Sequence, residues 1–77
     1  MFINITIEVA EARYDIRIDS EQRIQAGLSE LLKKGKMQLR NSLPHYFHSR
    51  LNQKPVSAYK TFAEEHVFDG DILTAII

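Results

Sequence analysis

The chain has 77 residues, which is enough for one domain with a modest core and too few for two, so we expect a single domain over residues 1–77. Hydrophobic residues make up 44% of it and charged residues 26%, a balance that is typical of folded globular proteins and argues against disorder. Ten Lys and Arg balance ten Asp and Glu, and Cys is absent, so the sequence lacks both the basic excess of a nucleic-acid-binding protein and the means to form disulfides.

Two segments with a period of two open the chain. Residues 2–9 carry Ile or Val at every odd position from 3 to 9, and residues 13–18 carry apolar side chains at their even positions. This alternation predicts two half-buried strands, with the odd residues of the first strand facing the core. The link over residues 10–12 is short enough for a hairpin, so we expect the two strands to be neighbours.

The spacing then changes to that of a helix. Apolar residues recur three or four positions apart between Ile24 and Leu32, which predicts a helix over 21–34. We expect Ser20 to cap its first turn and Gly35 to end it in a left-handed conformation.

The second half of the chain predicts shorter elements. Thr61 and Glu64 have the spacing of a capping box, and Gly70 is suited to the positive φ of a tight turn. The predicted fold class is α+β: the order β-β-α-β-β-(short helix)-β, with the last strand beside the first in a mixed sheet packed on one helix. In chain order we expect a connection over 36–45, a strand over 46–50, a turn over 51–53, a short edge strand over 54–56, a helical turn over 61–64, a tight turn over 69–71 and a last strand over 72–77.

This order of elements, at this length, resembles ubiquitin and its relatives, which share the ubiquitin-like β-grasp fold. Among them the chain resembles the small bacterial YukD/EsaB group, which is linked to type VII secretion systems. The segments 2–7, 14–18 and 68–73 carry this resemblance, the last through its Asp-Gly-Asp turn before the final strand. The resemblance implies a cytoplasmic accessory protein that acts by binding or regulation and is not an enzyme.

The last residues bear on conjugation. Ubiquitin-like modifiers and sulfur carriers need a flexible tail that ends in Gly-Gly, whereas this chain stops at Ala75-Ile76-Ile77, within its last predicted strand. We therefore expect a non-conjugated protein-binding module. The alternative is a ubiquitin-like carrier or modifier whose Gly-Gly tail is absent from this chain.

No residue pattern indicates catalysis, a cofactor or a metal site. His45, His48 and His66 lack the clustered ligands of a metal site, and the acids at 64, 65, 69 and 71 suit cap and turn roles. The serines have no partners that would make a nucleophile, and a Gly-rich phosphate loop is missing. The chain also lacks a signal-peptide pattern and an apolar run of the ~20 residues that span a bilayer, so we expect a cytoplasmic protein without direct membrane insertion.

The outer face of the sheet, opposite the helix, is the candidate protein-binding site. If the odd residues of the first strand face the core, its even residues face outward; the same logic applies to the third strand, with the last strand between them. This surface mixes apolar, aromatic and basic groups, and the resemblance points the same way because ubiquitin uses the corresponding face for recognition. The competing interpretation is that the apolar members are covered by the chain itself. The nine candidates are Phe2, Asn4, Thr6, Tyr46, His48, Arg50, Ile72, Thr74 and Ile76.

The charges are unevenly distributed along the chain. Residues 33–54 contain Lys and Arg but no acid, whereas residues 64–71 are rich in Asp and Glu. We interpret both as solvated surface; the alternative is a basic edge that attracts an acidic partner. The zero net charge disfavours a nucleic-acid partner for the basic segment. The last strand and the 54–56 edge leave room for homo-oligomers that form by β-pairing.

Overall fold

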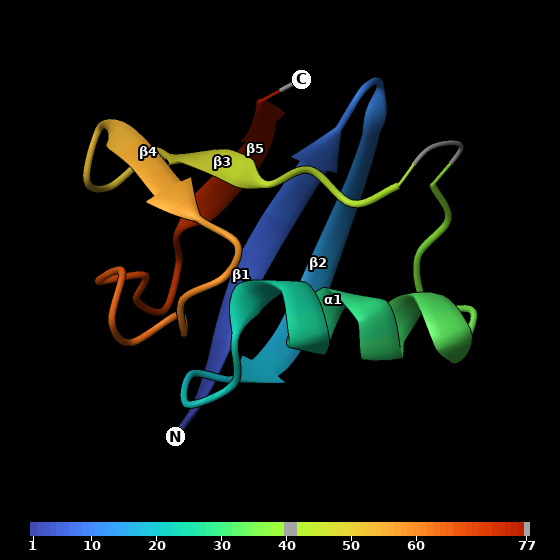
Figure 1. Ribbon diagram of the computed structural model, residues 1–77, viewed down its shortest axis with the longest axis horizontal. Coiled ribbons are helices and arrows are strands. Elements are labelled where there is room, and N and C mark those ends of the chain that lie inside the picture. Colours follow the sequence, from blue (N-terminus) through green and yellow to red (C-terminus); the bar gives the residue numbers. More distant parts are fainter. Residues whose placement is uncertain (40–41, 77) are drawn as a thin grey trace.

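The computed structural model describes residues 1–39 and 42–76, and these form a mixed β-sheet with a helix across one face (Figure 1). The elements are β1 (Phe2–Val9), β2 (Ala12–Asp19), α1 (Ile24–Lys33), β3 (Tyr46–Ser49), β4 (Lys54–Ser57) and β5 (Ile72–Ile76). The strand order is β2-β1-β5-β3-β4, in which β1 and β5 are parallel and the other neighbours are antiparallel. The last strand lies beside the first, as predicted, and the α+β class is confirmed.

The strand boundaries differ slightly from those predicted. β2 is one residue longer at each end, and β4 extends to Ser57. β3 stops at Ser49, which leaves Arg50 in the following turn. The predicted end of the last strand, Ile77, lies outside the described residues.

The alternation in β1 and β2 decides which side chains form the core. In their antiparallel register Ile3 lies opposite Ile18 and Ile5 opposite Ile16, and all four are buried. Each such side chain removed from water contributes about 1.5–3 kcal/mol, so the inward face is strongly specified. The remaining core residues are Ile7, Ile24, Leu28, Met37, Phe47, Val56, Ala58, Phe62, Val67 and Leu73.

The helix crosses β2 at Gly27. A Cβ atom at this position would lie 2.5 Å from Cδ1 of Ile18, closer than non-bonded atoms can approach. The missing side chain therefore leaves room for the end of the Ile18 side chain against α1.

The start of the helix differs from the prediction. It begins at Ile24, after Arg23 as N-cap, and Ser20 is buried upstream of it instead of capping it. The N–H groups of its first turn donate to carbonyl oxygens from another part of the chain. Ile24 N–H donates to Lys60 O at 2.9 Å and Gln25 N–H to Ala58 O at 2.8 Å. The helix therefore needs no side-chain cap, because distant backbone carbonyls accept the hydrogen bonds that such a cap would accept.

The end of the helix agrees with the prediction. Gly35 has a φ of 74°, and its N–H donates to Leu32 O, while Lys36 N–H donates to Leu31 O. These two bonds make a Schellman motif, in which a left-handed residue reverses the chain.

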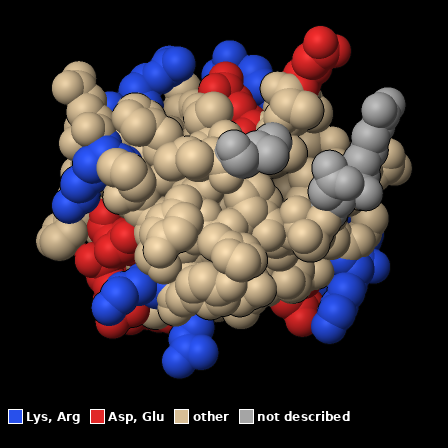
Figure 2. Space-filling view, turned by 45° about the horizontal axis from the view of Figure 1, so that its top comes forward, with Lys and Arg blue, Asp and Glu red and all other residues tan. Residues whose placement is uncertain are grey.

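The connection from α1 to β3 covers one end of the core. Met37, which the sequence did not single out, is buried there, and Leu43 packs against the core as a half-buried side chain. Figure 2, in which the upper end of Figure 1 is turned forward, shows a broad area without Lys, Arg, Asp or Glu, with charges of both signs around its rim.

The predicted short helix at 61–64 is a turn in the described chain. Its capping box is nevertheless formed: Thr61 N–H donates to Glu64 Oε1 and Glu64 N–H donates to Thr61 Oγ1, both at 2.9 Å. The chain then leaves through His66, whose φ of 59° turns it away before another helical turn can form.

The prediction that the last strand leaves an edge for pairing is wrong. β5 lies inside the sheet, between β1 and β3, and pairs with both. Its place between the first and third strands agrees with the one predicted for the outer face, and the edges of the described sheet are β4 and β2.

Candidate protein-interaction surface

The outer face of the sheet, away from α1, is formed by alternate residues of each strand. The register aligns Arg13, Glu8 and Thr74 across β2, β1 and β5, and Thr74 lies opposite His48 on β3. The residues between them point inward to the core. Eight predicted site residues lie on this face, namely Phe2, Asn4, Thr6, Tyr46, His48, Ile72, Thr74 and Ile76.

The β3–β5 patch, which we define as Tyr46, His48, Ile72, Thr74 and Ile76, combines apolar and polar side chains on the outer face of two neighbouring strands. Tyr46 lies directly opposite Ile76, and their exposed fractions are 52% and 44%. The next outward pair, His48 and Thr74, is also exposed, and Ile72 is half-buried one outward position further along β5. The competing interpretation, that the chain itself covers the apolar members, therefore does not hold for Ile76 and holds in part for Ile72.

The other predicted residues lie further from this patch. Thr6 is the β1 residue beside Ile72, whereas Phe2 is four residues earlier, about 13 Å along the strand. Phe2 instead lies near Arg17, whose Cζ is 5.3 Å from the centre of its ring. Arg50 lies in the turn after β3, where its N–H donates to Ile72 O at 3.0 Å.

The β1–β2 half of the face is polar and internally bonded. Thr74 Oγ1 donates to Glu8 Oε1 at 2.9 Å, and Arg13 Nε lies 3.5 Å from Glu8 Oε2. Thr6 Oγ1 donates to Asp15 Oδ1 at 2.6 Å. A shallow depression of about 310 Å³ lies here, lined by Asn4, Ile5, Thr6, Asp15, Ile16 and Arg17.

A buried carboxylate positions the strands beneath the patch. Asp71 is fully buried, and it accepts hydrogen bonds from Ser49 Oγ at 2.6 Å, Leu51 N–H at 3.1 Å and Ile72 N–H at 2.7 Å. Asn52 extends the network, because its Nδ2 donates to Ser49 Oγ and to His66 O. The network joins the end of β3 to the start of β5.

Sequence reasoning assigned Asp71 to a turn and missed its burial. The available signal was Ser49, which occupies an inward position of the predicted strand 46–50. A polar side chain at a core position requires a buried hydrogen-bond partner, and that requirement could have pointed to a nearby acid.

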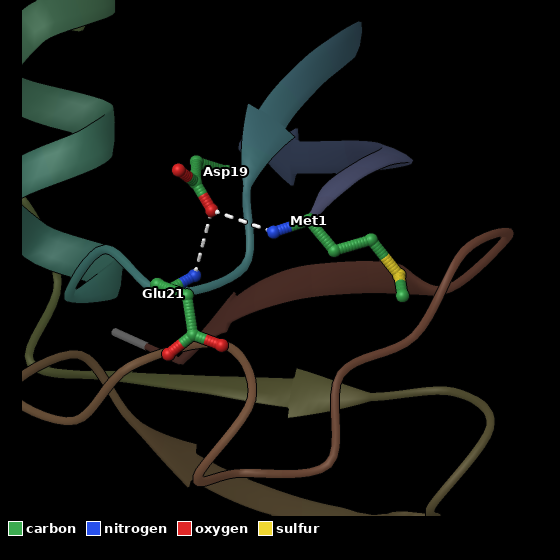
Figure 3. A network of polar contacts seen from close by, with 3 residues as sticks. All are labelled: Met1, Asp19 and Glu21. Carbon is green, nitrogen blue, oxygen red and sulfur yellow. Dashed lines mark hydrogen bonds and ion pairs between the residues drawn. The ribbon is translucent and has the colours of Figure 1, made fainter.

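Asp19, which the sequence did not single out, orders the segment between β2 and α1 (Figure 3). Asp19 Oδ1 accepts a hydrogen bond from Glu21 N–H at 3.0 Å and contacts the Met1 amino group at 3.2 Å. The Glu21 N–H, followed by the Met1 amine, lowers the pKa of Asp19 below its ordinary value. The pKa of Glu64 is also lowered, chiefly by the hydrogen bond from Thr61 N–H.

The three histidines are exposed. Their rings are not clustered: His45 stacks edge-on against Tyr59 and His66 against Phe68. Within residues 1–39 and 42–76, no group of three or more His, Asp or Glu side chains is arranged to hold a metal ion. In the same part of the chain, no helix is both long and apolar enough to cross a membrane.

The fold matches a solved structure although the sequence matches neither a family model nor a curated protein. That structure is the EccD5 ubiquitin-like domain from Mycobacterium xenopi, with a TM-score of 0.61 over 99% of this chain and 93% of that chain. The identity is 16%, so the likeness concerns the fold alone. The chain has the ubiquitin-like β-grasp fold, as its order of elements predicted. Membership of the YukD/EsaB group stays a prediction.

Proposed function

We propose that this protein is a ubiquitin-like protein-binding module that serves as a cytoplasmic accessory component of a bacterial type VII secretion system. Its fold supports the first part, because a β-grasp presents a preformed sheet face with one side free of the helix. The second part rests on the resemblance of segments 2–7, 14–18 and 68–73 to the YukD/EsaB group. The EccD5 domain that shares the fold is likewise a ubiquitin-like part of its protein.

The observation that carries the proposal is the β3–β5 patch. A directly paired Tyr46 and Ile76 both keep about half of their surface exposed, next to the polar pair His48 and Thr74 of the same patch. Apolar area of this kind contributes about 25 cal/mol per Å² when a partner covers it, and Tyr is a frequent anchor of protein interfaces.

The frame under the patch is suited to binding without rearrangement. β5 is paired on both sides, and the Asp71–Ser49 hydrogen bond closes one end of the β3–β5 pair. A surface that is already ordered loses little conformational entropy when a partner binds, so more of the contact energy appears as affinity.

The proposal is tested by NMR, in which isotope-labelled protein is titrated with the cytoplasmic parts of type VII secretion-system proteins from the same bacterium. Chemical-shift changes should concentrate on the β3–β5 patch. Ile76→Asp and His48→Asp should each weaken binding by about tenfold or more, because each places a carboxylate in the contact area.

The matched control is Tyr59→Asp, which changes a 49% exposed aromatic that packs on His45 outside the strands. It should leave the affinity unchanged. Unchanged binding of both patch variants, with folded spectra, would refute the use of this surface. A lack of binding to every type VII secretion-system protein tested would refute the secretion role.

A further inference from the structure

The β2 edge is the longer free edge of the described sheet. β2 has eight residues and pairs on one side only, with β1. The opposite edge, β4, has four residues and contains Pro55, which cannot donate a hydrogen bond. An incoming strand therefore finds a longer and more regular template at β2.

The hydrogen bonds that β1 and β2 already make show which backbone N–H and C=O groups of β2 point away from the sheet. Ser20 N–H donates to Met1 O, so the even residues of β2 direct their backbone groups toward β1. In agreement, Thr6 N–H donates to Asp71 O and Gly70 N–H to Asn4 O, which places the even residues of β1 toward β5. The odd residues of β2, opposite those even residues, therefore direct their N–H and C=O groups to the free side.

Those same odd residues alternate in charge. Their side chains lie on the outer face and read Arg13, Asp15, Arg17, Asp19 along the strand. Both carboxylates are already held in place, Asp15 by the Thr6 hydroxyl and Asp19 by Glu21 N–H and the Met1 amine. A row of charges of one sign would repel the same row on a second copy, whereas the alternating signs of β2 can pair with opposite charges.

We propose that two copies of this chain associate by antiparallel pairing of their β2 strands, with Ile16 opposite Ile16 of the second copy. In this register Arg13 faces Asp19 of the second copy, and Asp15 faces its Arg17. Every charged pair is therefore opposite in sign. The outward N–H and C=O groups of Arg13, Asp15 and Arg17 meet outward-pointing partners, whereas the Asp19 carbonyl already accepts from Gln22 N–H of its own chain.

The backbone directions and the side-chain charges of β2 disfavour the neighbouring registers. A shift of one residue sets outward backbone groups against inward ones. A shift of two residues places Asp15 opposite Asp15, or Arg17 opposite Arg17, and like charges directly across a strand pair are destabilising. On the inner face the proposed register joins Ile16 to Ile16 and Tyr14 to Ile18, which continues the core across the joint.

The test uses charge reversal at the centre of the strand, measured by sedimentation equilibrium on the full chain from micromolar to millimolar concentration. Each of Asp15→Arg and Arg17→Asp creates two like-charge pairs, so each alone should raise the dimer dissociation constant by about tenfold or more. An equimolar mixture of the two variants should form a heterodimer, because each then faces the opposite sign. The double variant D15R/R17D should recover the homodimer.

Lys54→Glu, a charge reversal on the β4 edge, is the matched control and should leave association unchanged; circular dichroism checks that every variant is folded. In the wild type, amide exchange at residues 13, 15, 17 and 19 should slow as the concentration rises. The proposal is overturned if the wild type sediments as a monomer throughout, if the two reversals leave association unchanged, or if their mixture fails to associate. The β3–β5 patch is left free in this arrangement, so these results are independent of the proposed function.

Discussion

At the scale of single residues, Asp71 shows how one buried acid can organise two strand ends. Its two carboxyl oxygens accept hydrogen bonds from three donors: a hydroxyl and two backbone N–H groups. Ser49 Oγ also accepts from Asn52 N–H and Nδ2–H, so its own hydrogen is free to point at Asp71. The donors and acceptors of the network are thereby matched.

We expect Asp71→Asn to lower the free energy of unfolding by about 1–3 kcal/mol. The substitution replaces the oxygen that accepts the Ser49 hydroxyl hydrogen with an NH2 group, so two donors would face each other in a buried site. Urea unfolding followed by circular dichroism measures the change. Asp69→Asn is the control: its exposed side chain keeps an oxygen for Asn4 N–H, and the cost should stay within about 0.5 kcal/mol. Equal stability of the two variants would contradict a structural role for the buried acid.

At the scale of elements, the two ends of α1 are determined in different ways. The C-terminal end depends on local residues, because Gly35 alone supplies the left-handed turn and the carbonyls it satisfies are a few residues away. The N-terminal end depends on the carbonyls of Ala58 and Lys60, about thirty-five residues later in the chain.

We expect Gly35→Ala to destabilise the protein by about 1 kcal/mol, because a Cβ atom is disfavoured at a φ of 74°. The space around this position is open, so the cost is conformational and not steric. Gly35→Asn is the matched variant and should cost less, since Asn tolerates the left-handed region. Thermal unfolding measures both, and an equal loss in the two variants would argue against the φ angle as the cause.

At the scale of the whole molecule, several distant segments meet at the start of α1. Ala63 N–H donates to Ser20 O and Phe62 N–H to Gln22 O, so the 61–66 turn is fastened to the link between β2 and the helix. The two carboxylates with lowered pKa values, Asp19 and Glu64, lie in these two segments. Their ionisation is therefore coupled to folding of the junction.

We expect the protein to lose stability as the pH falls through the ordinary pKa values of Glu64 and Asp19, 4.5 and 3.8, and on through their lowered folded-state values. In this window the unfolded chain binds more protons than the folded one, so acid favours unfolding, and the contribution is fully present at neutral pH. Asp19→Asn and Glu64→Gln should each make the decline shallower in urea unfolding from pH 7 to acid. Glu11→Gln, at the exposed hairpin turn, is the control, and a decline as steep in all variants as in the wild type would disprove the linkage.

Much of the fold could be predicted because its cause is local. The alternation of residues 2–9 identifies β1 and its buried face, since a strand turns successive side chains to opposite sides. The same rule placed the outward residues of β3 and β5. It could not show that Tyr46 would pair with Ile76 while Phe2 lay apart from them, because neighbours across a sheet depend on strand order and register.

The sequence by itself determined the strands, the helix and its glycine stop, because backbone geometry and apolar periodicity act over a few residues. Only the tertiary structure decided the start of α1, the burial of Asp71 and the register that pairs β5 with β3. In each case the deciding hydrogen bonds join segments that are distant in sequence. The sheet order left β2 as a free edge, and that edge is the surface through which we expect two copies of the protein to meet.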